Sequence, residues 1–352
     1  MMQRKTKVSK YLTVPIQPIQ IDRDRSVAGL LEKMESAGFG AKQLAEAHRV
    51  WLDMLDDNTT IYLCGSGNII PAGMRRLIAY VIKNRFVDVL IMSGKVLYHD
   101  IHETLGRNHY QAHPSMSDEE LEAAEIYRVG NILANLEEYQ EADEWIGSVI
   151  NQLEQSKSYT IREFLQILGR ELSEIANEDG ILTSAFKSRI PVYCPDLIGS
   201  ELSIGISRLR FEKKIQINFD LSQDLIELMM IGQRSRNSGL IVLGSVNSQE
   251  MLAIADFCSY LNRVNIRGHK YGISIVADPM LLDVRTPSIN GSYKDIFGKL
   301  AKGALTAYVH CDPSIALPLI ITAMSQTAAK YMKGRKRPTF TFTGRELSID
   351  VP

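Results

Sequence analysis

Residues 59–310 alternate between two patterns of apolar and polar positions. Short, continuous apolar runs are followed by stretches in which apolar residues return every three or four positions. The first pattern is typical of strands buried on both faces of a parallel sheet, and the second of helices that cover such a sheet. The apolar runs occupy residues 59–64, 87–92, 189–194, 215–219, 238–244, 272–278 and 304–310. The helical stretches include residues 69–84, 162–175, 221–234 and 314–332. The sequence therefore predicts an α/β fold, a Rossmann-like parallel sheet with helices on both faces.

The segments outside this alternation set the expected domain boundaries. Residues 1–20 show no sustained period and predict an extended N-terminal arm, and a helix pair follows over residues 26–55. An acidic stretch, residues 117–155, interrupts the alternation and is interpreted as helical. We expect one domain over residues 21–335 and a polar, peripheral C-terminal tail over residues 336–352.

Composition excludes several classes of protein. The chain is 45% apolar and 23% charged, with 40 basic against 41 acidic residues, so nothing favours nucleic acid or an anionic membrane as a partner. No apolar run approaches the length of a membrane span, and the basic start is not followed by the apolar core of a signal peptide. We therefore expect a cytoplasmic protein. The four cysteines have neither zinc-site nor disulfide spacing.

His99 and His102 have the spacing of two metal ligands on one face of a helix. The chain contains no HExxH pattern beside them. We therefore expect no metal site.

Candidate chemistry follows the ends of the predicted strands. In an open parallel sheet, ligands bind beyond the carboxyl ends of the strands. The turns at these ends are residues 65–68, 93–94, 195–197, 244–247 and 311–314. Small residues there let backbone N–H groups approach a phosphate, while an acidic side chain can accept ribose hydroxyls. The first turn, Gly-Ser-Gly-Asn, is only a fragment of a dinucleotide-binding pattern, and a tight strand-to-helix connection explains it equally well.

The stretch YKDIFGKL, residues 293–300, contains a second candidate. Lys299 follows Phe297 and Gly298 between two apolar runs. One interpretation is an ordinary exposed lysine. The other is a lysine held against an aromatic wall, so that its neutral amine can attack an imine or carbonyl carbon.

Several of these stretches together resemble deoxyhypusine synthase and its bacterial and archaeal relatives, including homospermidine-synthase-like members. The resemblance runs from about residue 16 to about residue 330, and PAGMR followed in register by IAY and VDVL is its most specific part. It implies a deoxyhypusine synthase-like fold and a homotetramer. The family has Trp-Gly-Lys-aliphatic where this chain has Phe-Gly-Lys-Leu, so Lys299 resembles the lysine that carries the substrate as an imine.

The chemistry that this resemblance implies is redox-neutral. Bound NAD takes a hydride from a carbon next to an amine nitrogen of spermidine or a similar polyamine. Lys299 then attacks that carbon, expels diaminopropane and holds a butylamine unit as an imine. An acceptor amine displaces the lysine, and the retained NADH reduces the product.

The chain matches the family more closely at the residues expected near NAD, the cofactor side, than at the residues expected near the polyamine, the substrate side. Glu201 stands where relatives have aspartate, Glu250 where they have histidine, Tyr293 where they have glutamate, and Phe297 where they have tryptophan. Asp295 and Glu250 would restore anionic character to the substrate side. The residues that the resemblance places near NAD are Ser66, Gly67, Asn68, Ser93, Gly94, Asp283, Asp312 and Ser314.

These residues predict an NAD-dependent transferase that moves an aminobutyl group from a polyamine to an amine acceptor through Lys299. Two alternatives stay open. One is a noncatalytic relative that binds NAD or a partner subunit, since the glycine triplet of the family is Gly244-Ser245-Val246 here. The other is a lysine-imine enzyme acting on a different amine.

Overall fold

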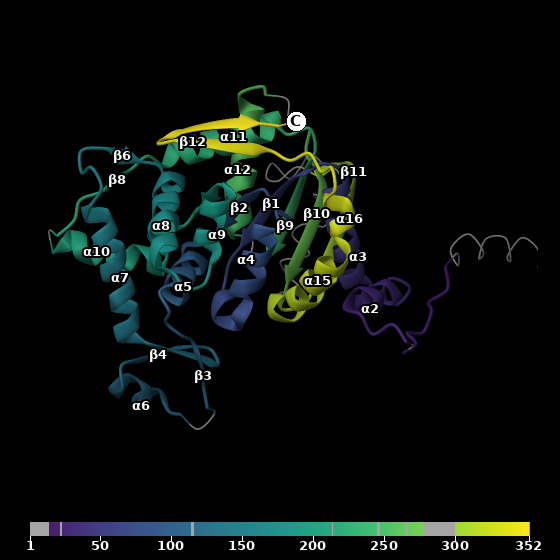
Figure 1. Ribbon diagram of the computed structural model, residues 1–352, viewed down its shortest axis with the longest axis horizontal. Coiled ribbons are helices and arrows are strands. Elements are labelled where there is room, and N and C mark those ends of the chain that lie inside the picture. Colours follow the sequence, from purple (N-terminus) through teal and green to yellow (C-terminus); the bar gives the residue numbers. More distant parts are fainter. Residues whose placement is uncertain are drawn as a thin grey trace, which may run out of the picture.

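A six-stranded, all-parallel sheet forms the centre of the computed structural model (Figure 1), which describes residues 14–21, 23–113, 116–212, 214–244, 247–264, 267–277 and 300–351. The strand order is β11-β10-β9-β1-β2-β7, and each neighbouring pair is parallel. The strands are β1 (Thr60–Gly65), β2 (Val89–Met92), β7 (Val192–Tyr193), β9 (Ser238–Leu243), β10 (His269–Val276) and β11 (Leu300–His310). The chain builds the sheet outward from β1 in one direction and then returns to β9 on its other side. The order therefore reverses between β1 and β9, at a topological switch point.

Burial on both faces explains why the central strands are continuous apolar runs. All six residues of β1 and all four of β2 are buried. Successive side chains of β1 point to opposite faces, so Ile61 and Leu63 belong to one core cluster while Tyr62 and Cys64 belong to another. The predicted α/β class is confirmed.

Helices cover both faces (Figure 1). The larger core cluster packs the sheet against α3 (Phe39–Asp56), α4 (Arg75–Lys83), α8 (Ile161–Ile175), α9 (Ile181–Ser188) and α15 (Pro313–Thr327). The smaller cluster packs the opposite face against α11 (Leu221–Arg234) and α12 (Asn247–Leu261). The short helices α2 (Val27–Met34) and α16 (Ala329–Met332) pack beside α3. No helix in the described part of the chain combines the length and apolar composition needed to cross a membrane.

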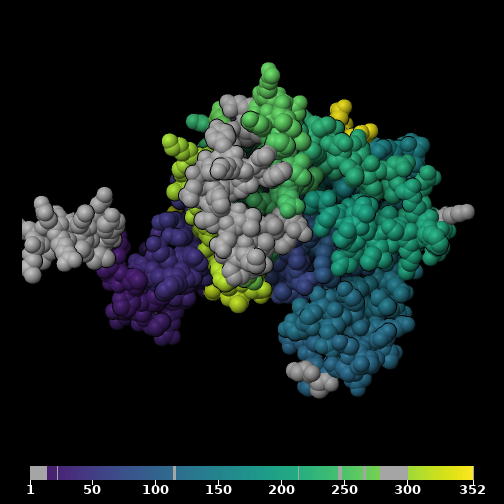
Figure 2. Space-filling model, turned by 180° about the vertical axis from the view of Figure 1, so that it is seen from behind, coloured from purple at the N-terminus to yellow at the C-terminus, as the bar shows by residue number. Residues whose placement is uncertain are grey.

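A lobe formed by the described residues of 105–135 projects from the rest of the molecule (Figures 1 and 2), beyond the carboxyl ends of the strands (Figure 1). It follows α5 (Gly94–Thr104) and precedes α7 (Leu136–Asn151). The lobe contains β3 (Tyr110–Gln111), α6 (Asp118–Ala123), β4 (Ile126–Val129) and β5 (Ile132–Asn135). The expectation of a helical stretch over residues 117–155 is wrong in its middle, because β4 and β5 form an antiparallel hairpin whose turn contains Gly130 at φ 64°.

Two further expectations differ from the structure. The predicted strand at 215–219 shrinks to β8 (Asn218–Phe219), which pairs with β6 (Ser158–Tyr159) outside the central sheet. The segment predicted as a polar, peripheral tail contains the hairpin of β12 (Thr339–Thr343) and β13 (Glu346–Asp350). Alternate residues of this hairpin, Phe340, Leu347 and Ile349, are buried in the smaller core cluster, so a polar outer face hides an apolar inner one.

The remaining described elements lie near the two ends of the strands. Residues 14–21 of the predicted N-terminal arm form no helix or strand and are exposed. The turn η1 (Ile70–Met74) joins β1 to α4, and η2 (Leu197–Gly199) leads from β7 into α10 (Glu201–Phe211).

Candidate functional site

The ends of β1, β2 and β9 meet at the switch point. The carbonyl oxygen of Gly65 accepts hydrogen bonds from the N–H of Ser93 at 2.9 Å and from Oγ of Ser248 at 2.8 Å. The N–H of Ser66 donates to the carbonyl oxygen of Leu243 at 3.1 Å. These hydrogen bonds join three turns that are far apart in the sequence. The turns lie at the carboxyl ends of the strands, which we call the carboxyl edge of the sheet.

Gly244 and Gly67 shape this edge in different ways. Gly244 has φ +84°, and a Cβ there would lie 2.4 Å from the backbone oxygen of Ser66. Gly67 also has a positive φ, +80°, but a Cβ there would meet nothing within 4 Å. Gly67 and Asn68 are exposed, whereas Ser66 is buried. The exposed part of this turn is the part that a dinucleotide could approach.

Ser93 and Gly94 are already engaged within the chain. Oγ of Ser93 accepts a hydrogen bond from the N–H of Val96 at 3.4 Å and caps α5. The N–H of Gly94 donates to Oδ1 of Asp196 at 2.8 Å, and a Cβ on Gly94 would lie 2.0 Å from Oγ of Ser200. Both residues are buried. They fix the close approach of β2 to the segment after β7, and a direct contact with a cofactor stays a prediction.

Asp312 and Ser314 form the turn after β11. Asp312 is exposed and caps α15, and its Oδ1 accepts hydrogen bonds from the N–H of Ser314 at 2.8 Å and from Oγ of Ser314 at 2.6 Å. The N–H of Cys311 donates to the carbonyl oxygen of Val276, which joins the ends of β10 and β11. An exposed carboxylate at this edge can accept a hydroxyl hydrogen bond.

The described substrate-side residues also lie at the carboxyl edge. Glu201 begins α10, and its Oε1 lies 3.5 Å from Nζ of Lys95. Glu250 is exposed in the first turn of α12, the helix whose Ser248 contacts Gly65. The other predicted site residues, Tyr293, Asp295, Phe297, Lys299 and Asp283, lie outside the described residues.

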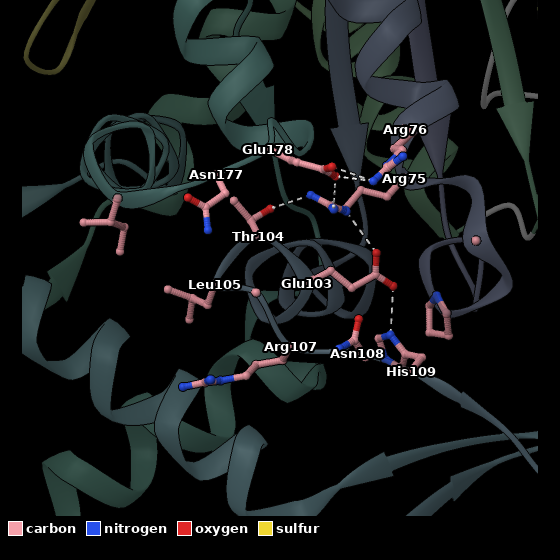
Figure 3. Close-up of a pocket in the computed structure, with 14 residues that line it drawn as sticks. Arg75, Arg76, Glu103, Thr104, Leu105, Arg107, Asn108, His109, Asn177 and Glu178 are labelled. Carbon is pink, nitrogen blue, oxygen red and sulfur yellow. Dashed lines mark hydrogen bonds and ion pairs between the residues drawn. The ribbon is translucent and has the colours of Figure 1, made fainter.

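A cavity of about 500 Å³ lies near this edge, and sequence reasoning assigned it no role. In Figure 3, Glu103 lies between Arg75 and His109, and Glu178 approaches Arg75 and Arg76. Nε of Arg75 donates to Oε2 of Glu103 at 2.9 Å, and Oε1 of Glu103 lies 2.8 Å from Nδ1 of His109. Two signals in the sequence could have pointed here: the PAGMRR stretch before α4 and the four histidines between residues 99 and 113.

Solved structures share this fold. The crystal structure of a candidate deoxyhypusine synthase from Entamoeba histolytica aligns with a TM-score of 0.59 and 16% sequence identity, covering 89% of this chain and 98% of that one. The ternary complex of AgrE with ornithine and NAD+ aligns with a TM-score of 0.50 and 11% identity, covering 88% of this chain and 34% of that one. At these identities the matches show the fold alone.

The sequence itself gives the family. The probable deoxyhypusine synthase 2 of Methanosarcina mazei is 32% identical over 343 residues, which cover 96% of this chain and 96% of that protein. The sequence profile of deoxyhypusine synthase matches residues 29–324. This match includes the PAGMR stretch and the turns at the switch point. The chain therefore belongs to the deoxyhypusine synthase family.

Proposed function

We propose that this protein is an NAD-dependent enzyme that transfers an aminobutyl group from a polyamine such as spermidine to an amine acceptor, with Lys299 carrying the group as an imine. The observation that carries the proposal is the switch point between β1 and β9, where Gly244 packs against Ser66 and leaves Gly67 and Asn68 exposed. Dinucleotides bind at such points in parallel sheets. AgrE, which has a similar fold, has been solved in complex with ornithine and NAD+, and this supports a dinucleotide as the cofactor.

The residues at the edge fit the parts of a dinucleotide. The positive φ of Gly67 and the open space around it leave room for a pyrophosphate against the turn. The exposed carboxylate of Asp312 is suited to a ribose hydroxyl. NAD, when bound, supplies a hydride acceptor for the carbon next to the amine nitrogen, and its reduced form returns the hydride at the end of the cycle.

The substrate side is proposed to hold cationic groups. Glu201 and Glu250 place carboxylates on two elements that begin at the carboxyl edge, α10 and α12. Ammonium groups of a polyamine would pair with them. Lys299 would attack the oxidised carbon as a free amine, form the C–N bond and expel the amine leaving group, so the lysine must be able to lose its proton.

The described start of β11 and the proposed NAD turns lie at opposite ends of the sheet. Leu300, the next residue in the chain, pairs with His269 at the amino end of β10. The turns proposed to hold NAD lie at the opposite, carboxyl edge. We propose that the active site is shared between subunits, with Lys299 of one copy of the chain acting at the cofactor of another, in keeping with the homo-oligomer that the family resemblance implies.

Borohydride trapping tests the proposal. Purified protein is incubated with NAD and a panel of amines that includes spermidine, reduced with borohydride and analysed by peptide mass spectrometry. We expect the wild type to gain the mass of an aminoalkyl unit at Lys299 with one amine, and Lys299→Arg to gain none, because arginine does not deprotonate. Since Tyr293 and Glu250 replace residues of the family, we expect an amine other than spermidine to be preferred.

NAD binding is the control for this experiment. Calorimetry should show that Lys299→Arg binds NAD as the wild type does, which separates loss of chemistry from loss of fold. Equal turnover in the arginine variant would contradict the role of Lys299. Binding of NAD without any trapped amine would instead favour a noncatalytic NAD-binding relative.

A further inference from the structure

Three histidines and a tyrosine cluster at the base of the lobe. His99 and His102 lie on α5, His109 follows this helix, and Tyr139 lies on α7. The side chains of His99 and His102 are fully buried, and those of His109 and Tyr139 nearly so. The proposed transfer chemistry uses none of these residues.

Three donor atoms of the cluster form a nearly equilateral triangle. Nδ1 of His99 lies 3.1 Å from Nε2 of His109, and Oη of Tyr139 lies 3.3 Å from the first atom and 3.4 Å from the second. Ligands bound tetrahedrally to zinc at about 2.0–2.1 Å are about 3.3–3.4 Å from one another. The three atoms lie within hydrogen-bonding distance of one another, and their spacing is also that of the ligands of one small metal ion.

A carboxylate orients His109 in the manner of a metal ligand. Oε1 of Glu103 lies 2.8 Å from Nδ1 of His109, and Oε2 accepts from Nε of Arg75 (Figure 3). A proton held on Nδ1 by the carboxylate leaves Nε2 as the acceptor nitrogen, and Nε2 faces Nδ1 of His99 and Oη of Tyr139. Metal-binding histidines commonly donate their second N–H to a carboxylate in this way.

Hydrogen bonding within the described residues does not satisfy the buried imidazoles. Nε2 of His99 and both ring nitrogens of His102 have no hydrogen-bond partner there. The ring of His102 is centred 5.0 Å from that of His109 and 4.7 Å from that of Tyr139.

We propose that His99 Nδ1, His109 Nε2 and Tyr139 Oη bind a divalent transition metal ion of the zinc class, with His102, whose ring packs against those of His109 and Tyr139, as a further donor. No set of three His, Cys, Asp or Glu side chains in the described part of the chain is arranged to hold a metal, and here a phenol supplies the third donor. The metal would deprotonate Tyr139, as metals do to weakly acidic ligands. It would join α5, α7 and the start of the lobe.

Metal binding is tested on protein made without a histidine tag and stripped with a chelator. Titration with Zn²⁺ should show one equivalent bound per chain, and Co²⁺ should give the visible absorption of a tetrahedral site. His109→Gln and Tyr139→Phe should each weaken the affinity by about tenfold or more. His48→Gln is the matched control, because His48 is also buried, with a pKa lowered to about 4, but bonds to Thr327 away from the cluster.

The melting temperature of the wild type tests metal binding without any variant. Zn²⁺ should raise its melting temperature and the chelator should lower it, because a ligand that binds the folded state stabilises it. A substoichiometric metal content without tetrahedral Co²⁺ absorption would overturn the proposal. So would an affinity in His109→Gln equal to that of wild type.

Discussion

Gly244 and Gly67 separate two reasons for a glycine at the switch point. Both have positive φ, but only at Gly244 would a Cβ collide with backbone, at 2.4 Å from the carbonyl oxygen of Ser66. Gly67→Ala should cost about 1–2 kcal/mol of unfolding free energy, the usual penalty for a left-handed residue. Gly244→Ala should cost clearly more, since β1 and β9 must also separate at their ends. Urea denaturation of both variants measures the difference.

The contrast between these variants decides the interpretation. Equal losses in Gly244→Ala and Gly67→Ala would show that backbone conformation alone matters and that the contact with Ser66 is not tight. A larger loss at Gly244, together with weaker NAD binding by that variant, would support the proposed cofactor position.

Sequence reasoning located residues of the edge because parallel strands bring all their carboxyl ends together. Ser66, Gly67, Asn68 and Asp312 could be placed there without knowledge of side-chain contacts. The same reasoning could not show that the N–H of Gly94 is already bonded to Asp196, since that contact spans two loops 102 residues apart. The histidine cluster could not be predicted from the sequence either, because His109 and Tyr139 contact α5 only through the tertiary structure.

The N-terminus of α9 is held by a side chain of α5. The two carboxylate oxygens of Asp100 accept hydrogen bonds from the N–H groups of Ile181 and Leu182 at 2.7 and 3.0 Å. Burial nevertheless raises the pKa of Asp100 to about 6, from an ordinary value near 3.8. The hydrogen bonds favour the ionised carboxylate, whereas burial favours the protonated acid. The contact between Asp100 and the start of α9 therefore depends on pH.

Titration of Asp100 stabilises the folded protein more in acid than at neutral pH. Between about pH 6 and pH 4 the folded protein takes up a proton at Asp100 that the unfolded chain does not, so this group increases the unfolding free energy as pH falls. Asp100→Asn removes the titration. The stability of wild type relative to the variant should therefore rise by roughly 1–3 kcal/mol on going from pH 7 to pH 4. Denaturant titrations at several pH values measure it, and a constant difference would contradict it.

Elements were predictable where one interaction dominates the pattern. The strands β1, β2, β9 and β10 are buried on both faces, and their apolar runs follow directly. The hairpin of β4 and β5 was not predictable in the same way, because its residues are only partly covered and the flanking segments are rich in acidic helix formers. The sequence of the C-terminal hairpin, β12 and β13, appeared polar because only alternate residues of the two strands face the core.

Exposed apolar side chains and the proposed shared site both favour assembly of the chain into an oligomer. Ile198 of η2 is 77% exposed, and Ile204 and Phe211 of α10, the helix that Glu201 begins, are 59% and 90% exposed. We expect a closed homo-oligomer that covers such side chains, most simply a dimer of dimers. Light scattering at micromolar concentration should give a multiple of the 39.5 kDa chain mass. A monomer would contradict both the assembly and the shared site.

Mixing two inactive variants tests the shared site directly. Lys299→Arg lacks the imine-forming amine, and Asn68→Trp places a bulky side chain in the turn proposed to contact NAD. If each site combines the lysine of one subunit with the turn of another, a mixed dimer contains one site with both changes and one site with neither. Random assembly after co-refolding should then restore about one quarter of wild-type activity, although each variant alone is inactive. If the lysine and the turn of the same chain formed the site, every site would keep one defect, and the mixture would be as inactive as its components.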